Sequence, residues 1–156
     1  MKATEIIVLA IILIAVIAGA WLIFNKPEPA AINVADTNSS SYDVQGMKIE
    51  ILQEGTGDST KIGDTVMVNY TGALLDGTKF DSSVDPSFGH VEPFPFTLGQ
   101  NRVIKGWELG VLGMKVGERR RLTIPPELAY GERGGGGGVI PPNATLIFEI
   151  DLLGIK

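Results

Sequence analysis

Apolar and polar residues alternate through much of the chain from Gly46 onward. Four alternating segments begin near Met47, Val66, Arg119 and Leu146, and turn sequences such as EGTGD, LLDGTKF and KVGE lie between them. Successive side chains of a β-strand point to opposite faces, so this alternation predicts strands that bury one face. The turn sequences indicate where the strands end.

A single stretch has helical spacing. Val103, Trp107 and Val111 fall four residues apart. Gly106 and Gly110 lie within this stretch and disfavour a helix, so we expect a short helix that depends on packing against the strands. Several antiparallel strands with one short helix across a sheet face predict an α+β domain.

The first part of the chain has a different pattern. Residues 6–24, IIVLAIILIAVIAGAWLIF, contain no charge, and nineteen residues at about 1.5 Å each span the ~30 Å core of a bilayer. Residues 1–24 are therefore predicted to be a signal-anchor with a single transmembrane helix. Lys2 and the small residues 18–20 also resemble a cleaved secretory signal, but the apolar run continues through Phe24, which favours the retained anchor.

Residues 25–45 contain two prolines and many small polar residues. This composition predicts a flexible linker with little structure of its own, which reaches roughly 25 Å. The folded domain is then expected over residues 46–156. Short positive N-terminal tails usually stay in the cytoplasm, so we expect a membrane-anchored protein with its domain outside the cytoplasm. If the signal is cleaved, the domain is secreted.

Composition excludes several kinds of partner and catalytic site. The net charge of −5 disfavours nucleic acid as the main partner. The absence of cysteine excludes disulfides and thiolate chemistry, and the lone His90 cannot form a multi-histidine metal site. We expect neither a metal nor a cofactor.

The run GERGGGGGVIPP, residues 131–142, has five glycines before a double proline. It lacks the Lys-Ser or Lys-Thr of a phosphate-binding loop, and the prolines block a following helix. Glycine leaves the backbone free and proline fixes it, so a mobile tip beside a fixed VIPP is expected. Val139 and Ile140 at its edge suit a flap that closes over an apolar ligand.

Polar residues that suggest catalysis have simpler interpretations. Ser82 and Ser83 lack a nearby base, because His90 lies in a separate SFGH loop that we expect to be solvated, so a serine hydrolase is disfavoured. Residues 119–121, three arginines on a predicted strand, are expected to form a solvated edge, with one stem packing inward while the charged heads reach water.

Aromatic residues gather in or beside the predicted elements. They are Tyr70, Phe80, Phe94, Phe96, Trp107, Tyr130 and Phe148. Most are expected in the core, including Phe96. Trp107 on its short glycine-flanked helix is instead suited to the floor of a shallow pocket.

Three motifs together resemble a known family. VNYTGALLDGTKFDSS, PFPFTLGQNRVIKGWELGVLGMKVGERRRLTIPPELAYG and VIPPNATLIFEIDLL are similar to the FKBP-type peptidyl-prolyl isomerases, the rapamycin-binding immunophilins. The resemblance covers residues 46–156. It implies a curved antiparallel sheet wrapped around a short helix, and cis-trans isomerisation of X-Pro bonds without a covalent or metal catalyst.

The resemblance also implies a set of site residues. Asp81, the Tyr130 hydroxyl and the Ile104 backbone N–H are expected to act on the substrate, with Trp107 under the proline ring. The apolar pocket is expected to comprise Tyr70, Phe80, Phe94, Val103, Trp107, Val139, Ile140 and Phe148. Asp81 could instead be structural and shape the pocket wall.

Three departures from the family's pattern affect the site. The flap tip is plain glycine, SSVDPSFGHVEPF is longer than in the shortest members, and no chaperone insert is present in the flap. The sequence thus predicts an isomerase for proline-containing segments of exported proteins, which macrolides such as rapamycin would inhibit. The alternative is a membrane-tethered, non-catalytic module that binds proline-containing peptides.

Overall fold

The computed structural model describes residues 40–156. The predicted membrane segment and most of the predicted linker lie outside these residues, so both stay predictions. In the described part, no helix has the length and apolar character needed to cross a membrane.

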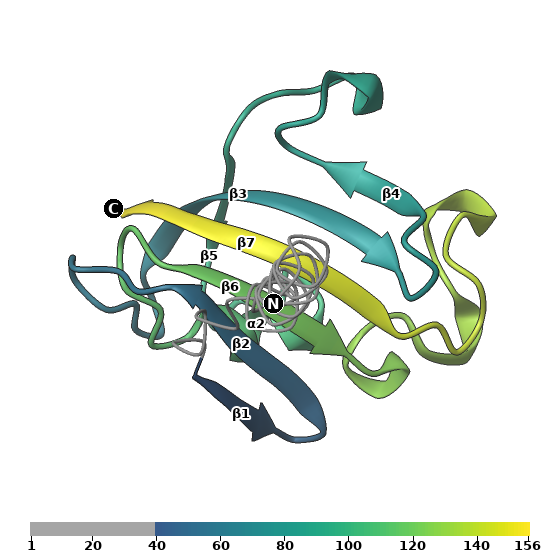
Figure 1. Ribbon diagram of the computed structural model, residues 1–156, viewed down its shortest axis with the longest axis horizontal. Helices are drawn as coiled ribbons and strands as arrows, with labels where there is room; N and C mark the ends of the chain where they lie inside the picture. The colour runs from purple at the N-terminus through teal and green to yellow at the C-terminus, as the bar shows by residue number, and fades with distance from the viewer. Residues whose placement is uncertain (1–39) are drawn as a thin grey trace, which may run out of the picture. The chain divides into compact units, whose positions relative to one another are not determined.

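One antiparallel sheet forms the body of the domain (Figure 1). Its strands are β1 (Ser41–Val44), β2 (Met47–Gln53), β3 (Thr65–Leu74), β4 (Lys79–Ser82), β5 (Phe94–Thr97), β6 (Arg119–Ile124) and β7 (Leu146–Ile155). They follow the order β1-β2-β6-β7-β3-β4, and β5 pairs with β3. The α+β class and all four alternating segments predicted from the sequence are confirmed.

Strand β1 corrects the predicted linker, because it lies within residues 25–45. It pairs with β2 through Tyr42 and Ile49, and the turn between them places Gln45 at φ 52° and Gly46 at φ 84°. Two consecutive positive φ angles are typical of a tight hairpin turn. Gln-Gly is a weak sequence signal for such a turn, so pairing with the edge of β2 makes residues 41–44 a strand.

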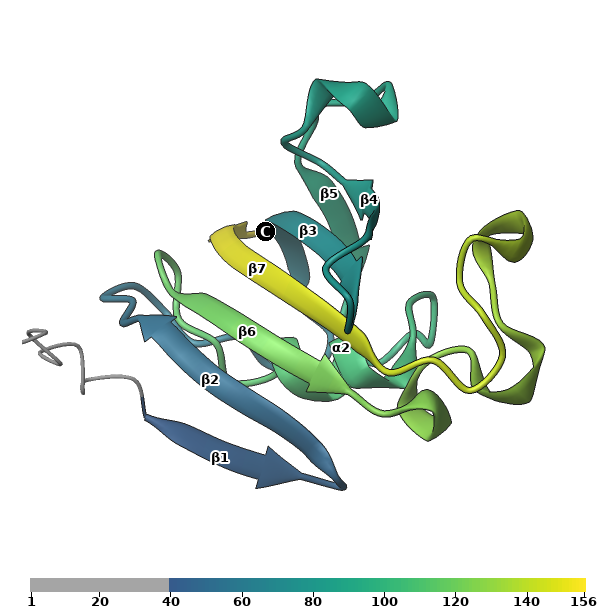
Figure 2. The same ribbon diagram turned by 45° about the vertical axis from the view of Figure 1, so that its right-hand side comes forward.

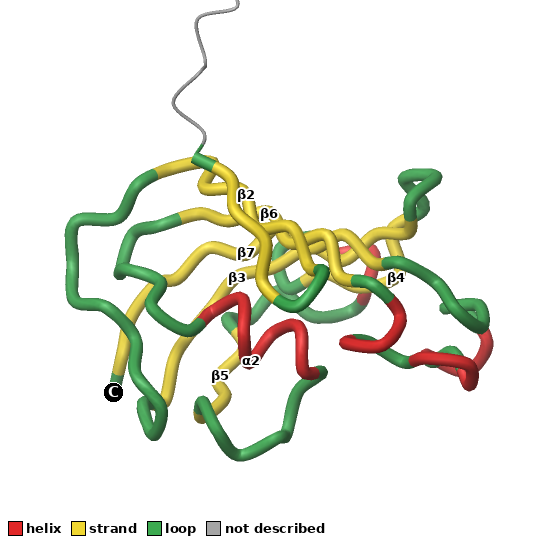
Figure 3. Tube along the Cα trace, turned by 90° about the horizontal axis from the view of Figure 1, so that it is seen from below, coloured by secondary structure: helices red, strands yellow, loops and turns green. Residues whose placement is uncertain are grey.

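Helix α2 (Lys105–Val111) packs against the concave face of the curved sheet (Figure 3). Its glycines face β6. A Cβ on Gly106 would lie 2.5 Å from Cγ2 of Ile124, and one on Gly110 would collide with Leu122. The two glycines disfavour the helix locally, but they let its backbone approach the sheet closely.

The core lies between α2 and the sheet. It is built from the inward positions of the strands, among them Val66 and Val68 of β3 and Leu146 and Ile150 of β7, all fully buried. Phe96 is buried as expected. The alternating pattern therefore identified the buried face of β2, β3 and β7.

The arginine run is only partly a solvated edge. The Arg120 guanidinium is 5% exposed and pairs with Glu118, which is 2% exposed. Arg120 also donates to the carbonyls of Gly110 (2.9 Å) and Leu112 (3.4 Å) at the end of α2. The expectation that all three charged heads reach water is wrong for Arg120, because the unpaired helix carbonyls and a buried carboxylate replace water around it.

Two long connections project beyond the sheet (Figure 2). The first, residues 83–93, joins β4 to β5 and contains the 3-10 turn η1 (Pro86–Phe88). The second joins β6 to β7 and contains η2 (Pro126–Leu128), η3 (Gly131–Arg133) and η4 (Gly136–Gly138). Both connections contribute to the site described next.

Candidate active site

A cavity of about 330 Å³ opens beside the N-terminal end of α2. Its lining comes from β3, β4, β5, the start of α2, the flap and β7. The residues are Tyr70, Phe80, Asp81, Phe94, Arg102, Val103, Ile104, Trp107, Tyr130, Gly136, Val139, Ile140 and Phe148.

The structure brings all eleven sequence-predicted site residues to this cavity. Their individual roles stay predictions. Sequence reasoning missed Arg102 and Gly136, which also line the cavity. Arg102 directly precedes the Val103-Ile104 pair, so its position in the chain was an available signal.

Trp107 lies at the centre of an aromatic cluster and is 5% exposed. Its ring centroid lies 5.1 Å from that of Tyr70 and 5.2 Å from that of Phe148, both at steep angles. Phe96 and Phe94 follow at 5.6 and 6.0 Å. Edge-to-face packing of this kind is favourable for aromatic rings. In the described residues the buried Nε1 of Trp107 has no hydrogen-bond partner.

Gly72 makes room for the aromatic wall. A Cβ there would lie 2.7 Å from both the Phe80 and the Phe148 rings. These two rings pack edge to face with centroids 5.5 Å apart. An inward glycine on β3 thus allows two rings to close one side of the cavity.

Asp81 is the acidic group of the cavity. The Tyr70 hydroxyl donates a 2.7 Å hydrogen bond to its Oδ2 atom, between adjacent strands β3 and β4. Burial, and then the hydrogen bond to Asp81, raise the pKa of Tyr70 well above its usual range. Tyr70 therefore stays a neutral donor. The hydrogen bond gives Asp81 a structural contact, and a structural role was one of the two roles that the sequence left open for it.

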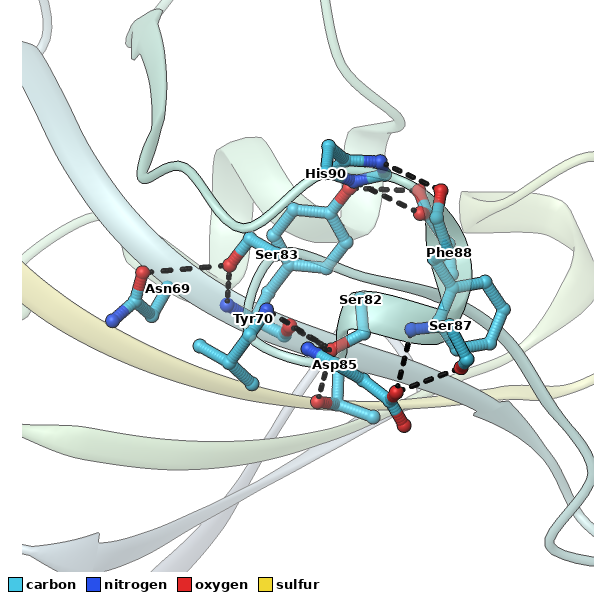
Figure 4. Close-up of polar contacts among 11 residues, drawn as sticks. Asn69, Tyr70, Ser82, Ser83, Asp85, Ser87, Phe88 and His90 are labelled. Carbon is cyan, nitrogen blue, oxygen red and sulfur yellow. Dashed lines mark hydrogen bonds and ion pairs between the residues drawn. The ribbon is translucent and has the colours of Figure 1, made fainter.

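The neighbouring serines support β4 rather than the chemistry. Ser82 and Ser83 are buried. The backbone N–H of Tyr70 donates to Ser83 Oγ at 2.9 Å, and Ser82 Oγ donates to the Tyr70 carbonyl at 3.2 Å (Figure 4). Their hydroxyls hold β4 against β3, which fixes the backbone on either side of the Tyr70–Asp81 contact.

The flap closes one side of the cavity through glycine geometry. Gly134 has φ 63°, and a Cβ there would lie 3.0 Å from the Pro141 carbonyl carbon. Gly135 exchanges backbone hydrogen bonds with Ile140 at 3.0 and 3.1 Å. A Cβ on Gly135 would also lie 3.0 Å from the Tyr130 ring. The glycine run is needed for this tight turn. The sequence alone predicted only a mobile backbone for the run.

Tyr130 places its ring between the flap and the cavity, and its side chain is partly exposed. Burial, and then the charge of Asp81, raise the pKa of its hydroxyl. The hydroxyl is therefore a neutral donor over the physiological range.

Ile104 is the N-cap of α2, with φ −60° and ψ 150°. Its carbonyl accepts from the backbone of Trp107 at 2.9 Å. Its own N–H donates to no acceptor in the described part of the chain. The residues that line the cavity thus include two with a hydrogen-bond donor, the amide of Ile104 and the hydroxyl of Tyr130.

His90 is exposed, as expected of a loop residue, but it also contacts the site. Its Nε2 atom lies 3.4 Å from Oδ1 of Asp81, and the two side chains are 46% and 41% exposed. Its Nδ1 atom lies 3.2 Å from the Phe88 carbonyl oxygen (Figure 4). Sequence spacing gave no signal for this contact, because the loop 83–93 folds back onto β4.

Comparison with known proteins agrees with this geometry. The family model described as FKBP-type peptidyl-prolyl cis-trans isomerase matches residues 57–153. The chain belongs to this family, and it is an enzyme of the peptidyl-prolyl cis-trans isomerase class. The resemblance in the three sequence motifs is thereby confirmed.

Individual relatives and a solved structure give the extent of the similarity. The chain is 55% identical over 114 residues to FK506-binding protein 1A of Neurospora crassa, which covers 72% of this chain and 91% of the relative. It is 55% identical over 108 residues to the FK506-binding protein of Neisseria meningitidis, covering 69% and 94%. The crystal structure of FkpA from Escherichia coli matches with a TM-score of 0.65 and 43% identity, over 74% of this chain and 51% of that one.

These comparisons also define the folding unit. Residues 37–156 form a compact unit of their own. The Neisseria relative consists almost entirely of the matched region. We therefore use residues 37–156 as an independently folded fragment below.

Proposed function

We propose that the cavity binds an X-Pro segment with the proline ring against Trp107. The Ile104 N–H and the Tyr130 hydroxyl donate to carbonyl oxygens of the substrate. Phe80, Phe94 and Phe148 surround the bound residues. The observation that carries this proposal is an aromatic-floored cavity with two hydrogen-bond donors among its lining residues and one carboxylate held by Tyr70.

The chemistry follows from the peptide bond. Rotation about it crosses a barrier of about 18–20 kcal/mol, because amide resonance is lost. The planar amide separates charge onto its oxygen and the twisted amide does not, so an apolar surrounding favours the twisted form relative to water. Acceleration by about 10³–10⁵ requires only ~4–7 kcal/mol, and hydrogen bonds that hold the substrate partly turned contribute to it. A nucleophile is not needed.

We further propose that the substrates are exported proteins and that macrolides such as FK506 and rapamycin compete for the cavity. The apolar residues 6–24 support export. The names of the FK506-binding relatives support macrolide binding. In this proposal the domain works outside the cytoplasm, tethered to the membrane, or it is released if the signal is cleaved.

The site is tested by measuring isomerisation of a blocked X-Pro tetrapeptide by residues 37–156, with and without rapamycin. We expect catalysis that the drug abolishes. Tyr130→Phe should keep the melting temperature and lower kcat/KM modestly, because it removes one donor and no buried contact. Drug binding without catalysis by the native fragment would contradict the proposed mechanism.

Export is tested on the full chain, expressed with its own N-terminus. We expect it in the carbonate-resistant membrane fraction, with the domain digested by protease added to the outer side. A shorter protein in the medium would indicate the cleaved signal instead. A domain protected from outside protease in intact cells and accessible only after lysis would contradict export.

A further inference from the structure

The contacts of His90 with Asp81 and Phe88 depend on the protonation of the His90 ring. His90 lies between two acceptors, the Phe88 carbonyl at Nδ1 and the Asp81 carboxylate at Nε2. Neither of these groups donates. A neutral imidazole carries one N–H, and only the protonated ring carries two. Both contacts are therefore favourable together only when His90 is charged.

The loop that carries His90 is held at its other end. Asp85 accepts from the Ser87 backbone at 3.1 Å and pairs with Lys79 of β4 at 3.3 Å. The backbone of Asp85 also donates to Ser82 Oγ at 3.2 Å. Residues 83–93 are thus fixed to β4 at their start, and the His90 contacts decide how their second half lies against Asp81.

We propose that His90 is a positioning residue of the isomerase site: in its protonated form it pairs with Asp81, which lines the cavity, and holds the loop 83–93 beside that carboxylate. Asp81 also accepts the Tyr70 hydroxyl, so the pair fixes both oxygens of one carboxylate. This inference rests on the proposed use of the cavity as the substrate site. It predicts stronger substrate binding on the acid side of neutrality.

The other ionisable groups on the elements around the pair are of types that keep their charge over this range. They are Tyr70 on β3, Lys79 on β4, Asp85 and Glu92 in the loop, Arg102 before α2, and Tyr130 before the flap. His90 is the only histidine in the chain. Histidine is the residue type that changes its charge between about pH 5 and 8, so one substitution isolates the effect.

The test measures kcat/KM of residues 37–156 between pH 5.5 and 8 by NMR exchange spectroscopy, which needs no coupling protease. A blocked Ala-Ala-Pro-Phe peptide has no group that titrates in this range. We expect the native fragment to be about two- to fivefold more efficient at pH 5.5 than at pH 8, the range typical of an exposed ion pair. His90→Gln should be flat at the lower value, and His90→Arg flat near the higher one. Equal profiles for the native fragment and His90→Gln would overturn the proposal.

A second readout separates this inference from the proposed function. The backbone amide signals of Asp81 and Phe88 should move between pH 5.5 and 8 in the native fragment and stay fixed in His90→Gln. If the fragment does not catalyse at either pH, the proposed function fails, while these shifts still report the pair. Identical shifts in both proteins would overturn the pairing itself. Melting temperatures at each pH verify that both variants are folded.

Discussion

The hydroxyl of Tyr70 and the carboxylate of Asp81 form a 2.7 Å hydrogen bond between β3 and β4, at the wall of the cavity. We predict that Tyr70→Phe lowers the free energy of unfolding by about 1 kcal/mol, because Asp81 loses its donor. It should also lower kcat/KM, because the carboxylate is free to turn. Urea unfolding measures the first effect. Tyr42→Phe, at an exposed tyrosine of β1, is the matched control and should change neither quantity.

Tyr70 also predicts a dependence on alkaline pH. Its pKa is raised in the folded state, while an unfolded tyrosine ionises near pH 10. The folded state therefore favours the neutral phenol, and this stabilisation is fully present below about pH 10 and is lost as the pH rises further. Between pH 9 and 11.5 the native fragment should lose more stability than Tyr70→Phe. Parallel losses in the two proteins would contradict the raised pKa.

The packing of α2 gives a third prediction. Alanine at position 106 should favour an isolated helix by up to about 1 kcal/mol. In the folded protein its Cβ would meet Ile124, whose β-branched side chain has little freedom to turn. We expect Gly106→Ala to cost about 1–3 kcal/mol of unfolding free energy. Gly154→Ala is the control, because a Cβ there meets nothing within 4 Å. A stabilised Gly106→Ala would show that the helix can move away from β6.

Strand β6 contains a buried and an exposed arginine side by side, which allows a direct comparison. Arg120→Met removes the charged partner of the buried Glu118, which keeps the 2.9 Å hydrogen bond from the Lys115 backbone N–H, and we expect a loss of about 3–5 kcal/mol. Arg119→Met breaks the exposed pair with Asp151 and should cost at most about 1 kcal/mol. Urea unfolding at pH 7 measures both. Equal costs would mean that Glu118 finds other partners or water.

The flap supplies the last prediction. Gly134→Ala combines a positive φ with a Cβ 3.0 Å from the Pro141 carbonyl carbon, so it should displace Val139 and Ile140 from the cavity. We expect kcat/KM to fall about tenfold or more, as for other small misplacements of binding groups. Gly137→Ala has a similar φ of 65° with nothing within 4 Å. It should cost about 1 kcal/mol of stability and much less activity, and an equal loss of activity would contradict the steric argument.

Much of the fold was predictable because one signal was repeated in four strands, β2, β3, β6 and β7. In β3 and β7 apolar residues recur at every second position, because these positions face the core that the strands share. The helix was predictable from Val103, Trp107 and Val111, although its glycines argue against it locally. Strand β1 was not predictable, because three exposed residues and the partly buried Val44 become a strand only through the free edge of β2.

The site likewise contains residues that the sequence predicts and residues that it does not. The aromatic residues of the cavity were predictable from motifs, because residue type and order identify them. The roles of Arg120 and His90 were not predictable, since burial of a charge and a contact between a loop and a strand depend on what else lies nearby. Arg120 is buried because Glu118 and the end of α2 surround it. His90 reaches Asp81 because η1 turns its loop back toward β4.

The sequence by itself determined the α+β class, most residues of the cavity, and the family, because periodicity and motif order are properties of the chain. Only the tertiary structure decided which glycines of the flap require positive φ, which arginine is buried, and that His90 meets Asp81. Those features depend on distances between segments far apart in the chain. Such distances are set when the sheet closes around α2, and no local pattern encodes them.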